Sequence, residues 1–363
     1  MTDVMDLLQP HIRRLEMYQG VDPMEVLAER AGIPPDKVIR LNGNENPYGP
    51  SPRVMEALGS YKLYNLYPDS EQRRLREALS DYLGIGPEYI VAGNGSDEII
   101  DLTLRMFLGP GEKIIDPAPT FGMYAVCARI CGGEVVTVPR DESFEIDLEA
   151  TQLALDSRTK AILFASPNNP TGNIAPEWQV RRLLEMGILV VVDETYYEFC
   201  GQTVLPLVQE YSNLMVLRTF SKWAGLAGLR IGLGVMHPEV ARVMINIKPP
   251  YNVNLAAEIA FLASIEGREG LMERVRAIVV ERERMFSLLS SLPGLRPWPS
   301  QANFILCQFP QGKGKDVYEG LARRGIFLRY FSNPRLRDFV RTSVGLPHET
   351  DALIEALNII LRE

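Results

Sequence analysis

The feature that most constrains the fold is a continuous apolar run over residues 187–192, GILVVV, which ends at Asp193. Strands that are buried on both faces of a parallel sheet have such runs, whereas half-exposed strands alternate apolar and polar residues. Shorter strand-like runs occupy residues 89–92, 113–116 and 161–165. Each of these is followed by a turn rich in glycine or proline and then by a helical pattern. This alternation favours an α/β fold with a parallel sheet.

The length and the charge of the chain limit its organisation and its partners. With 363 residues it can bury a large core, and two domains are the expected number. Its 38 Lys and Arg residues against 46 Asp and Glu residues give a net charge of −8, which argues against nucleic acid or an anionic membrane as the main partner. No apolar run has membrane-spanning length, and the first residues carry acids, so we expect no secretory signal and a cytoplasmic location.

The cysteines and histidines form no metal-binding pattern. None of Cys127, Cys131, Cys200 and Cys307 belongs to a Cys-x-x-Cys pair, and the three histidines are far apart in the sequence. We therefore expect reduced, buried thiols and no metal.

The pattern of elements changes toward the C-terminus. Short strand-like runs over 303–306, 326–329 and 339–344 alternate with helical patterns, and this indicates a small α+β domain. We predict an N-terminal arm over 1–40, a large domain over 41–255 and a small domain over 256–363 that includes a long connecting helix.

A lysine in unusual surroundings follows the strand-like run 215–218. A single lysine is most often a solvated surface charge. Lys222, however, lies next to the hydroxyls of Thr219 and Ser221 and shortly before Arg230, and all three can hydrogen-bond a phosphate. A lysine beside a phosphate site suggests a Schiff base to a phosphorylated aldehyde, because apolar surroundings make the amine nucleophilic. This points to pyridoxal 5'-phosphate.

Polar residues follow other predicted strands. The turn Gly95-Ser96-Asp97 opens a helix, so it either presents N–H groups to an anion or is an ordinary helix cap; the sequence leaves both open. Asp193 ends a buried strand and needs a partner, which is either a helix start, an arginine or a protonated ring nitrogen. Asn169 lies in a loop made rigid by prolines, where α/β sheets place ligand-binding side chains.

These segments together resemble the class I/II aminotransferases of pyridoxal-phosphate fold type I. The similarity extends from Tyr18 to the C-terminal helix. The matching segments, in order, are 44–47 (NENP), 67–68 (YP), 95–98 (GSDE), 121–124 (FGMY), 166–172 (SPNNPTG), 193–196 (DETY), 221–222 (SK), 228–230 (GLR) and 341–345 (RTSVG). The resemblance implies a large domain with a mostly parallel seven-stranded sheet between helices, and a small α+β domain.

The resemblance also implies a role for each cofactor residue. Lys222 would form the Schiff base and then move the proton between substrate and cofactor, and Asp193 would keep the pyridine nitrogen protonated. Tyr196 and Asn169 would bind the phenolic oxygen of the ring, and Phe121 would stack on the ring. The phosphate would be held by Gly95, Ser96, Asp97, Thr219, Ser221 and Arg230. Tyr67 would reach the phosphate in the partner subunit, which implies a homodimer with shared sites.

Within this family the chain is most similar to the histidinol-phosphate aminotransferases. That similarity implies transfer of the amino group of L-histidinol phosphate to 2-oxoglutarate, in histidine biosynthesis. Arg341 would bind the substrate carboxylate or phosphate and Arg329 would be a second cation there. The pocket would be lined by Tyr18, Asn46 and Asn303.

Three other functions stay open. An aromatic or broad-range amino acid aminotransferase, or a threonine-phosphate decarboxylase, would use the same scaffold. A catalytically silent relative that binds a ligand or a partner is also conceivable, although Lys222, Asp193 and Arg230 are all present.

Overall fold

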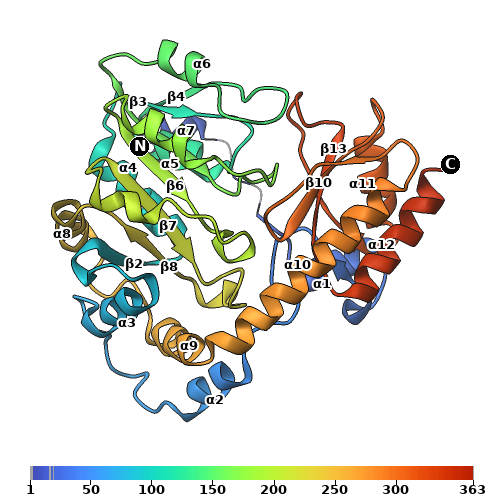
Figure 1. Cartoon of the computed structure of the whole chain (residues 1–363), viewed down its shortest axis with the longest axis horizontal. Helices are drawn as coiled ribbons and strands as arrows, with labels where there is room; N and C mark the ends of the chain where they lie inside the picture. Colours follow the sequence, from blue (N-terminus) through green and yellow to red (C-terminus); the bar gives the residue numbers. More distant parts are fainter. Residues whose placement is uncertain (1–2, 16–17, 19, 363) are drawn as a thin grey trace.

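The computed structural model describes residues 3–15, 18 and 20–362, which form a larger and a smaller body joined by a long helix (Figure 1). The larger body contains a seven-stranded sheet with the order β2-β8-β7-β6-β5-β3-β4. Only β8 runs antiparallel to its neighbours β2 and β7 within this sheet. The predicted α/β fold with a mostly parallel seven-stranded sheet is therefore confirmed.

The strands of the large sheet are β2 (Ile90–Asn94), β3 (Lys113–Asp116), β4 (Glu134–Thr137), β5 (Thr159–Ala165), β6 (Leu189–Asp193), β7 (Leu214–Thr219) and β8 (Ile231–Val235). The helices of this body are α2 (Pro52–Ser60), α3 (Arg73–Leu83), α4 (Ser96–Phe107), α5 (Met123–Ile130), α6 (Leu148–Leu153), α7 (Glu177–Leu184), α8 (Pro238–Ile247) and α9 (Leu255–Glu266).

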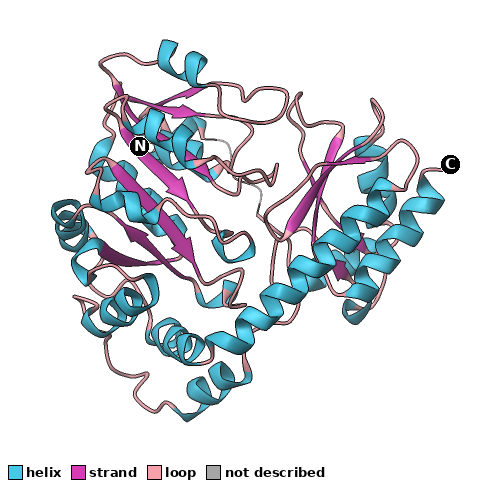
Figure 2. Cartoon of the chain, viewed as in Figure 1, coloured by secondary structure: helices cyan, strands magenta, loops and turns pink. Residues whose placement is uncertain are grey.

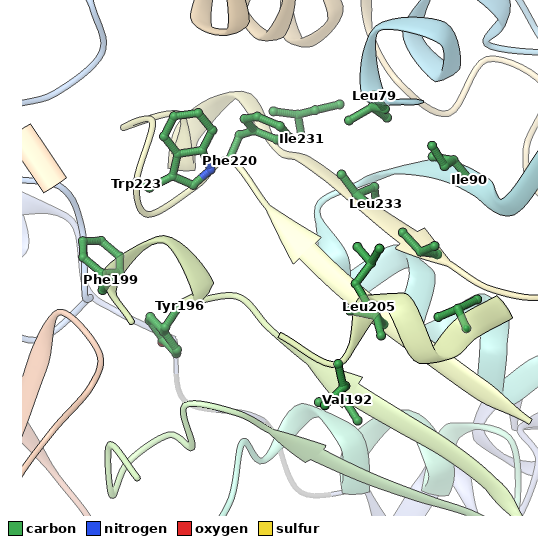
Figure 3. Close-up of a cluster of buried hydrophobic side chains, with 14 of the residues drawn as sticks. Leu79, Ile90, Val192, Tyr196, Phe199, Leu205, Phe220, Trp223, Ile231 and Leu233 are labelled. Carbon is green, nitrogen blue, oxygen red and sulfur yellow. The ribbon is translucent and has the colours of Figure 1, made fainter. Parts of the chain in front are cut away.

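Strand β6 shows why its sequence is apolar at every position. Val190 and Val192 belong to the hydrophobic core on one face of the sheet. Leu189 and Val191 belong to the core on the other face. Successive side chains of a strand point to opposite faces, so a strand covered on both faces needs apolar residues throughout. Figure 3 shows Val192 in the first of these cores, near Leu205 and below Leu233 of β8.

The smaller body combines antiparallel strands with three helices (Figure 2). Its four-stranded sheet has the order β12-β13-β10-β9. Its elements are α10 (Arg268–Ser290), β9 (Arg296–Pro297), β10 (Phe304–Gln308), α11 (Gly314–Ala322), β11 (Ile326–Phe327), β12 (Arg329–Tyr330), β13 (Phe339–Ser343) and α12 (Pro347–Ile360).

Two predicted segments are divided in the structure. Where the sequence predicts one long connecting helix after residue 255, the structure has two helices, because Gly267 ends α9 and also precedes the first residue of α10. The strand-like run 326–329 contributes to two sheets: Ile326 and Phe327 pair with β1 (Ile39–Arg40), whereas Arg329 pairs with β13.

The N-terminal segment contacts both bodies. Leu27 of α1 (Met24–Ala31) packs with Phe327, and β1 extends β11 in parallel. Farther toward the N-terminus, His11 Nε2 lies 3.2 Å from the carbonyl oxygen of Ile130 at the end of α5. The boundaries at residues 41 and 255 stay a prediction. No helix in the described ranges has the length and apolarity to cross a membrane.

Candidate active site

A cavity of about 620 Å³ lies at the carboxyl edge of the large sheet and is closed on one side by the smaller body. Parallel strands bring the residues that follow them to one edge, so the ends of β5, β6 and β7 all meet here. Thirteen of the predicted site residues line this cavity: Tyr18, Ser96, Asp97, Phe121, Asn169, Asp193, Tyr196, Thr219, Ser221, Lys222, Arg230, Arg329 and Arg341.

Asp193 is the buried acid at the end of β6, with 3% of its surface exposed. One carboxylate oxygen accepts a hydrogen bond from the Tyr124 hydroxyl at 2.9 Å. The other accepts from the Thr195 backbone N–H at 3.0 Å and from the Thr195 hydroxyl at 2.6 Å. All three donors are neutral, and burial raises the pKa of Asp193 above its ordinary value. A cation placed in the cavity beside Asp193 would restore its negative charge at neutral pH.

Lys222 projects into the cavity from the loop after β7. Its Nζ donates a hydrogen bond to the carbonyl oxygen of Gly43 at 3.1 Å. Burial, followed by the positive charge of Arg341, lowers the pKa of Lys222 to about 8. About a tenth of this amine is therefore neutral at pH 7, far more than for an ordinary lysine, and the neutral form is the one that attacks a carbonyl carbon.

The N-terminus of α4 forms one end of the cavity. Helix α4 begins at Ser96, and a helix N-terminus presents unpaired N–H groups to an anion. Arg230 lies against it, with Nη2 2.8 Å from Asp97 Oδ2. Gly95 has a φ of 80°, and a Cβ there would lie 2.3 Å from Arg230 Nη2. Gly232 is needed for the same approach, because a Cβ at that position would lie 2.3 Å from the Ser96 nitrogen.

Two hydroxyls complete this end. The Thr219 hydroxyl lies 2.9 Å from the Ser221 hydroxyl, and it accepts from the Ser221 N–H at 3.2 Å. Both side chains are buried. The combination of N–H groups, an arginine and hydroxyls is suited to a phosphate.

Arg341, on β13 of the smaller body, forms the opposite wall. Its Nη1 donates to Asn169 Oδ1 at 2.6 Å and its Nη2 donates to the Asn42 carbonyl oxygen at 2.7 Å. The Nε atom is buried and has no hydrogen-bond partner. Burial lowers the pKa of Arg341 to about 10, so the guanidinium stays charged at neutral pH. Arg329 lines the same wall and reduces the pKa of Arg341 further through charge repulsion.

Four aromatic side chains border the cavity: Tyr18, Phe121, Tyr196 and Phe331. Tyr196 is buried, and its ring meets the Phe304 ring edge to face at 5.0 Å. Phe121 makes edge-to-face contacts with Tyr124 at 5.5 Å and with Tyr18 at 6.0 Å. Tyr18 therefore brings the N-terminal segment to the cavity mouth, and burial raises the pKa of its hydroxyl.

Four of the predicted residues are not among those that line the cavity. Gly95 lies directly before α4, as described. Asn46 instead donates to the Trp223 carbonyl oxygen at 2.8 Å, and Asn303 donates to the Asn44 carbonyl oxygen at 3.0 Å. Tyr67 is 80% exposed and stacks on the exposed ring of Tyr251 at 4.4 Å. The roles proposed for these residues stay predictions.

Some residues that line the cavity or contact Asp193 were not among the residues predicted from the sequence. Asn42, Gly43 and Asn44 line the cavity, although the sequence analysis selected Asn46 from the same loop. Asn44 has a φ of 52°, the left-handed region that asparagine tolerates better than most residues. Tyr124 and Thr195, the partners of Asp193, both lie in segments recognised from the sequence.

A buried ionic cluster also escaped the sequence analysis. Arg218 Nη2 lies 2.7 Å from Glu194 Oε2, and Arg218 Nη1 lies 4.0 Å from Glu198 Oε1. The Arg218 guanidinium carbon lies 3.4 Å from the centre of the Tyr197 ring. Tyr82 donates to Glu198 at 2.7 Å. The acids flank Asp193 and Tyr196 in sequence, so the cluster fixes the segment that carries both site residues.

The donor set fits pyridoxal 5'-phosphate. The α4 N-terminus, Arg230 and the two hydroxyls suit its phosphate, and Asp193 suits its protonated ring nitrogen. Lys222, a half-buried amine of lowered pKa, suits its aldehyde. No group of three or more His, Cys, Asp and Glu side chains in the described part of the chain is arranged to hold a metal ion.

The fold and the cavity define an aminotransferase-like protein, and comparison with known proteins agrees. Residues 36–357 match the family "Aminotransferase class I and II", and the chain belongs to that family. It is 47% identical over 360 residues to the histidinol-phosphate aminotransferase of Roseiflexus castenholzii, covering 97% of both chains.

Solved structures extend the comparison. The histidinol-phosphate aminotransferase of Sinorhizobium meliloti, solved with pyridoxal-5'-phosphate, superposes with a TM-score of 0.88 at 26% identity, over 98% of this chain and 97% of the other. An aspartate aminotransferase of Thermotoga maritima has a TM-score of 0.86 at 21% identity, over 98% of this chain and all of the other. At 21% identity, the similarity to the aspartate aminotransferase shows only that the two proteins share a fold.

Proposed function

We propose that this chain transfers the amino group of L-histidinol phosphate to 2-oxoglutarate, giving imidazole-acetol phosphate and L-glutamate, with pyridoxal 5'-phosphate as cofactor. The observation that carries this is one cavity with Lys222 between a phosphate-binding end and a wall with Arg341 and Arg329. The near full-length similarity to histidinol-phosphate aminotransferases supports the substrate.

The residues divide the chemical work. Bound pyridoxal 5'-phosphate supplies an electron-withdrawing ring that stabilises negative charge on the substrate carbon. Asp193 holds the proton on the ring nitrogen. Lys222 would bind the cofactor aldehyde and would act as the general base that moves a proton at the substrate carbon. Tyr196 and Asn169 hydrogen-bond the phenolic oxygen.

The arginine wall selects the substrate. L-Histidinol phosphate carries a phosphate, whereas glutamate and 2-oxoglutarate carry a second carboxylate. Arginine binds both anions through the same planar set of donors. Arg341, with an unpaired Nε, and Arg329 can therefore accept the two substrates in turn. Alternating use of one site leads to ping-pong kinetics.

A half-reaction tests this assignment. The purified cofactor-loaded protein is mixed with L-histidinol phosphate in the absence of 2-oxoglutarate, and the cofactor absorbance is followed. We expect conversion to pyridoxamine phosphate with a second-order rate constant at least about 100-fold higher than for phenylalanine or aspartate, because only histidinol phosphate combines the imidazole and the anion in one molecule.

The other outcomes discriminate the alternatives. Faster conversion with phenylalanine would make the chain an aromatic or broad-range aminotransferase. Release of carbon dioxide from L-threonine phosphate would indicate a decarboxylase. A protein that binds no cofactor and gains no colour would be a silent relative. Addition of 2-oxoglutarate to the pyridoxamine form serves as the control, since it should restore the starting spectrum.

We also infer that the chain forms a homodimer with shared sites. Tyr67 and Tyr251 stack on the surface, and large apolar side chains lie near them in sequence: Met55, Leu63, Tyr64 and Leu66 are each more than 45% exposed. Exposed apolar groups of this kind mark interaction surfaces. In a two-fold dimer each subunit would present Tyr67 to the phosphate site of the other. A cytoplasmic location remains part of this proposal.

Subunit mixing tests the shared site. A Tyr67→Ala protein and a Lys222→Ala protein are each expected to be nearly inactive. After mixing and refolding in equal amounts, about a quarter of wild-type activity should return, because half of the dimers are hybrids and each hybrid has one intact site. The control is a mixture of Lys222→Ala with the Tyr67→Ala/Lys222→Ala double variant, which should stay inactive. No recovery in the first mixture would place Tyr67 outside the partner site.

A further inference from the structure

Asn44 is held from four directions by hydrogen bonds, and 1% of its surface is exposed. Its N–H donates to Ser343 Oγ at 2.8 Å, and its carbonyl oxygen accepts from Asn303 at 3.0 Å. Its side-chain Oδ1 accepts from the Ser343 hydroxyl at 3.0 Å. Its Nδ2 donates to the Tyr196 hydroxyl oxygen at 3.0 Å.

This pattern fixes the direction of the Tyr196 hydroxyl. The Ser343 oxygen already accepts from the Asn44 N–H, so the Ser343 proton is available for Asn44 Oδ1. In this orientation the amide nitrogen faces Tyr196, and an amide nitrogen can only donate. The Tyr196 oxygen therefore accepts from Asn44, and its own proton is left to point elsewhere, into the cavity that Tyr196 lines.

We propose that Asn44 is a positioning residue that holds the Tyr196 hydroxyl as a hydrogen-bond donor toward the phenolic oxygen of the cofactor, and that Ser343 orients Asn44 for this role. The proposal rests on the proposed function. It adds a residue from the loop 42–44, and it explains why a non-glycine residue adopts a φ of 52° there. Asparagine supplies both the tolerated backbone and the required donor.

The same contacts join the cofactor side of the site to the substrate side. Ser343 lies two residues after Arg341 on β13, and Arg341 donates to the Asn42 carbonyl oxygen. Lys222 donates to the carbonyl oxygen of Gly43, between these two contacts. A shift of β13 on binding of a substrate anion would thus be passed to Asn44 and through it to Tyr196.

The test follows the bound cofactor rather than the reaction. The visible absorbance of the cofactor-loaded protein is titrated with pH. A donor to the phenolic oxygen stabilises its negative charge and favours the deprotonated cofactor, so Tyr196→Phe should raise the titration midpoint by about one pH unit. Asn44→Gly should raise it by about half a unit, since Tyr196 loses its orientation but keeps its proton. Glycine accepts the φ of 52° without strain, which limits effects on the fold.

A double variant separates positioning from other effects. If Asn44 acts through Tyr196, Asn44→Gly should not move the midpoint further in a Tyr196→Phe protein. Asn44→Asp replaces the donor with an acceptor, and it should shift the midpoint at least as far as Tyr196→Phe. The matched control is Asn213→Gly, which removes an asparagine amide that donates to the Leu184 and Ile188 carbonyl oxygens; it should leave the midpoint unchanged.

Three results would overturn the proposal. One is a wild-type midpoint in both Asn44 variants with the cofactor bound. The second is an equal shift by Asn44→Gly with and without Tyr196, and the third is no shift for Tyr196→Phe itself. A wild-type protein that binds no cofactor would instead contradict the proposed function, and this inference with it.

Discussion

Replacing Lys222 with alanine is expected to lower the transamination rate by at least about 10³-fold, because the variant loses both the amine that holds the cofactor and the general base. The phosphate-binding end, Asp193 and the arginine wall remain, so the variant should still bind pyridoxal 5'-phosphate without a covalent bond. Borohydride reduction followed by mass spectrometry measures this directly. The wild type should gain the mass of the reduced cofactor on the peptide that contains Lys222, and the variant should not.

Lys113 provides the matched control for this experiment. Lys113 is a buried lysine and is the first residue of β3. Its Nζ lies 2.9 Å from Asp156 Oδ2. Lys113→Ala should lose stability but keep turnover and covalent labelling. Normal turnover of Lys222→Ala, or labelling of another lysine in the wild type, would contradict the assignment of Lys222 as the cofactor-binding amine and general base.

The second large effect is expected on stability, at the buried cluster around Arg218. Arg218→Met should lower the free energy of unfolding by about 3–5 kcal/mol, because it leaves Glu194 and Glu198 buried without their cation. Both carboxylates are nearly inaccessible to water, at 2% and 4% side-chain exposure. Denaturant unfolding at pH 7.5 measures the change. Arg182→Met is the control, since Arg182 pairs with Glu185 on the surface and its loss should cost less than about 0.5 kcal/mol.

The pH dependence of stability checks the same cluster. Burial raises the pKa of Glu198 to about 7, so the folded chain binds more protons than the unfolded chain between about pH 4.5 and 7. The contribution of Glu198 to stability therefore falls as the pH rises through this window. Glu198→Gln should remove that slope and retain an acceptor for Tyr82. An unchanged slope in Glu198→Gln would show that Glu198 is ionised in the folded chain at pH 5.

The sequence predicted the strands of the large sheet well, for a physical reason. A run such as 187–192 is apolar at every position, so a strand formed from it has two apolar faces. Such a strand is stable when helices cover both faces of its sheet. The structure places β6 at Leu189–Asp193, and the predicted acid is its last residue. Site residues at strand ends, such as Asn169 and Lys222, were predictable because the parallel topology brings strand ends together.

Loops and long-range pairs were not predictable in the same way. The loop 42–46 contains three asparagines, and no periodicity distinguishes them; only the left-handed backbone at Asn44 decides which amide reaches Tyr196. Arg218 lies in β7, and its partners lie 20 and 24 residues earlier. Tyr67 is 80% exposed and lies outside the cavity of its own chain, so its assignment to the site of a partner subunit stays a prediction.

The unbroken length of α10 has a mechanical consequence. Its 23 residues form a rod about 34 Å long that starts directly after Gly267, next to α9, and ends in the smaller body (Figure 1). A tilt of about 5° at the Gly267 end would displace the far end by about 3 Å, the length of one hydrogen bond. Arg329 and Arg341 lie on adjacent strands of the sheet carried by that body, so they would travel together. A small angular change at this glycine would therefore move both arginines together relative to the phosphate-binding end of the cavity.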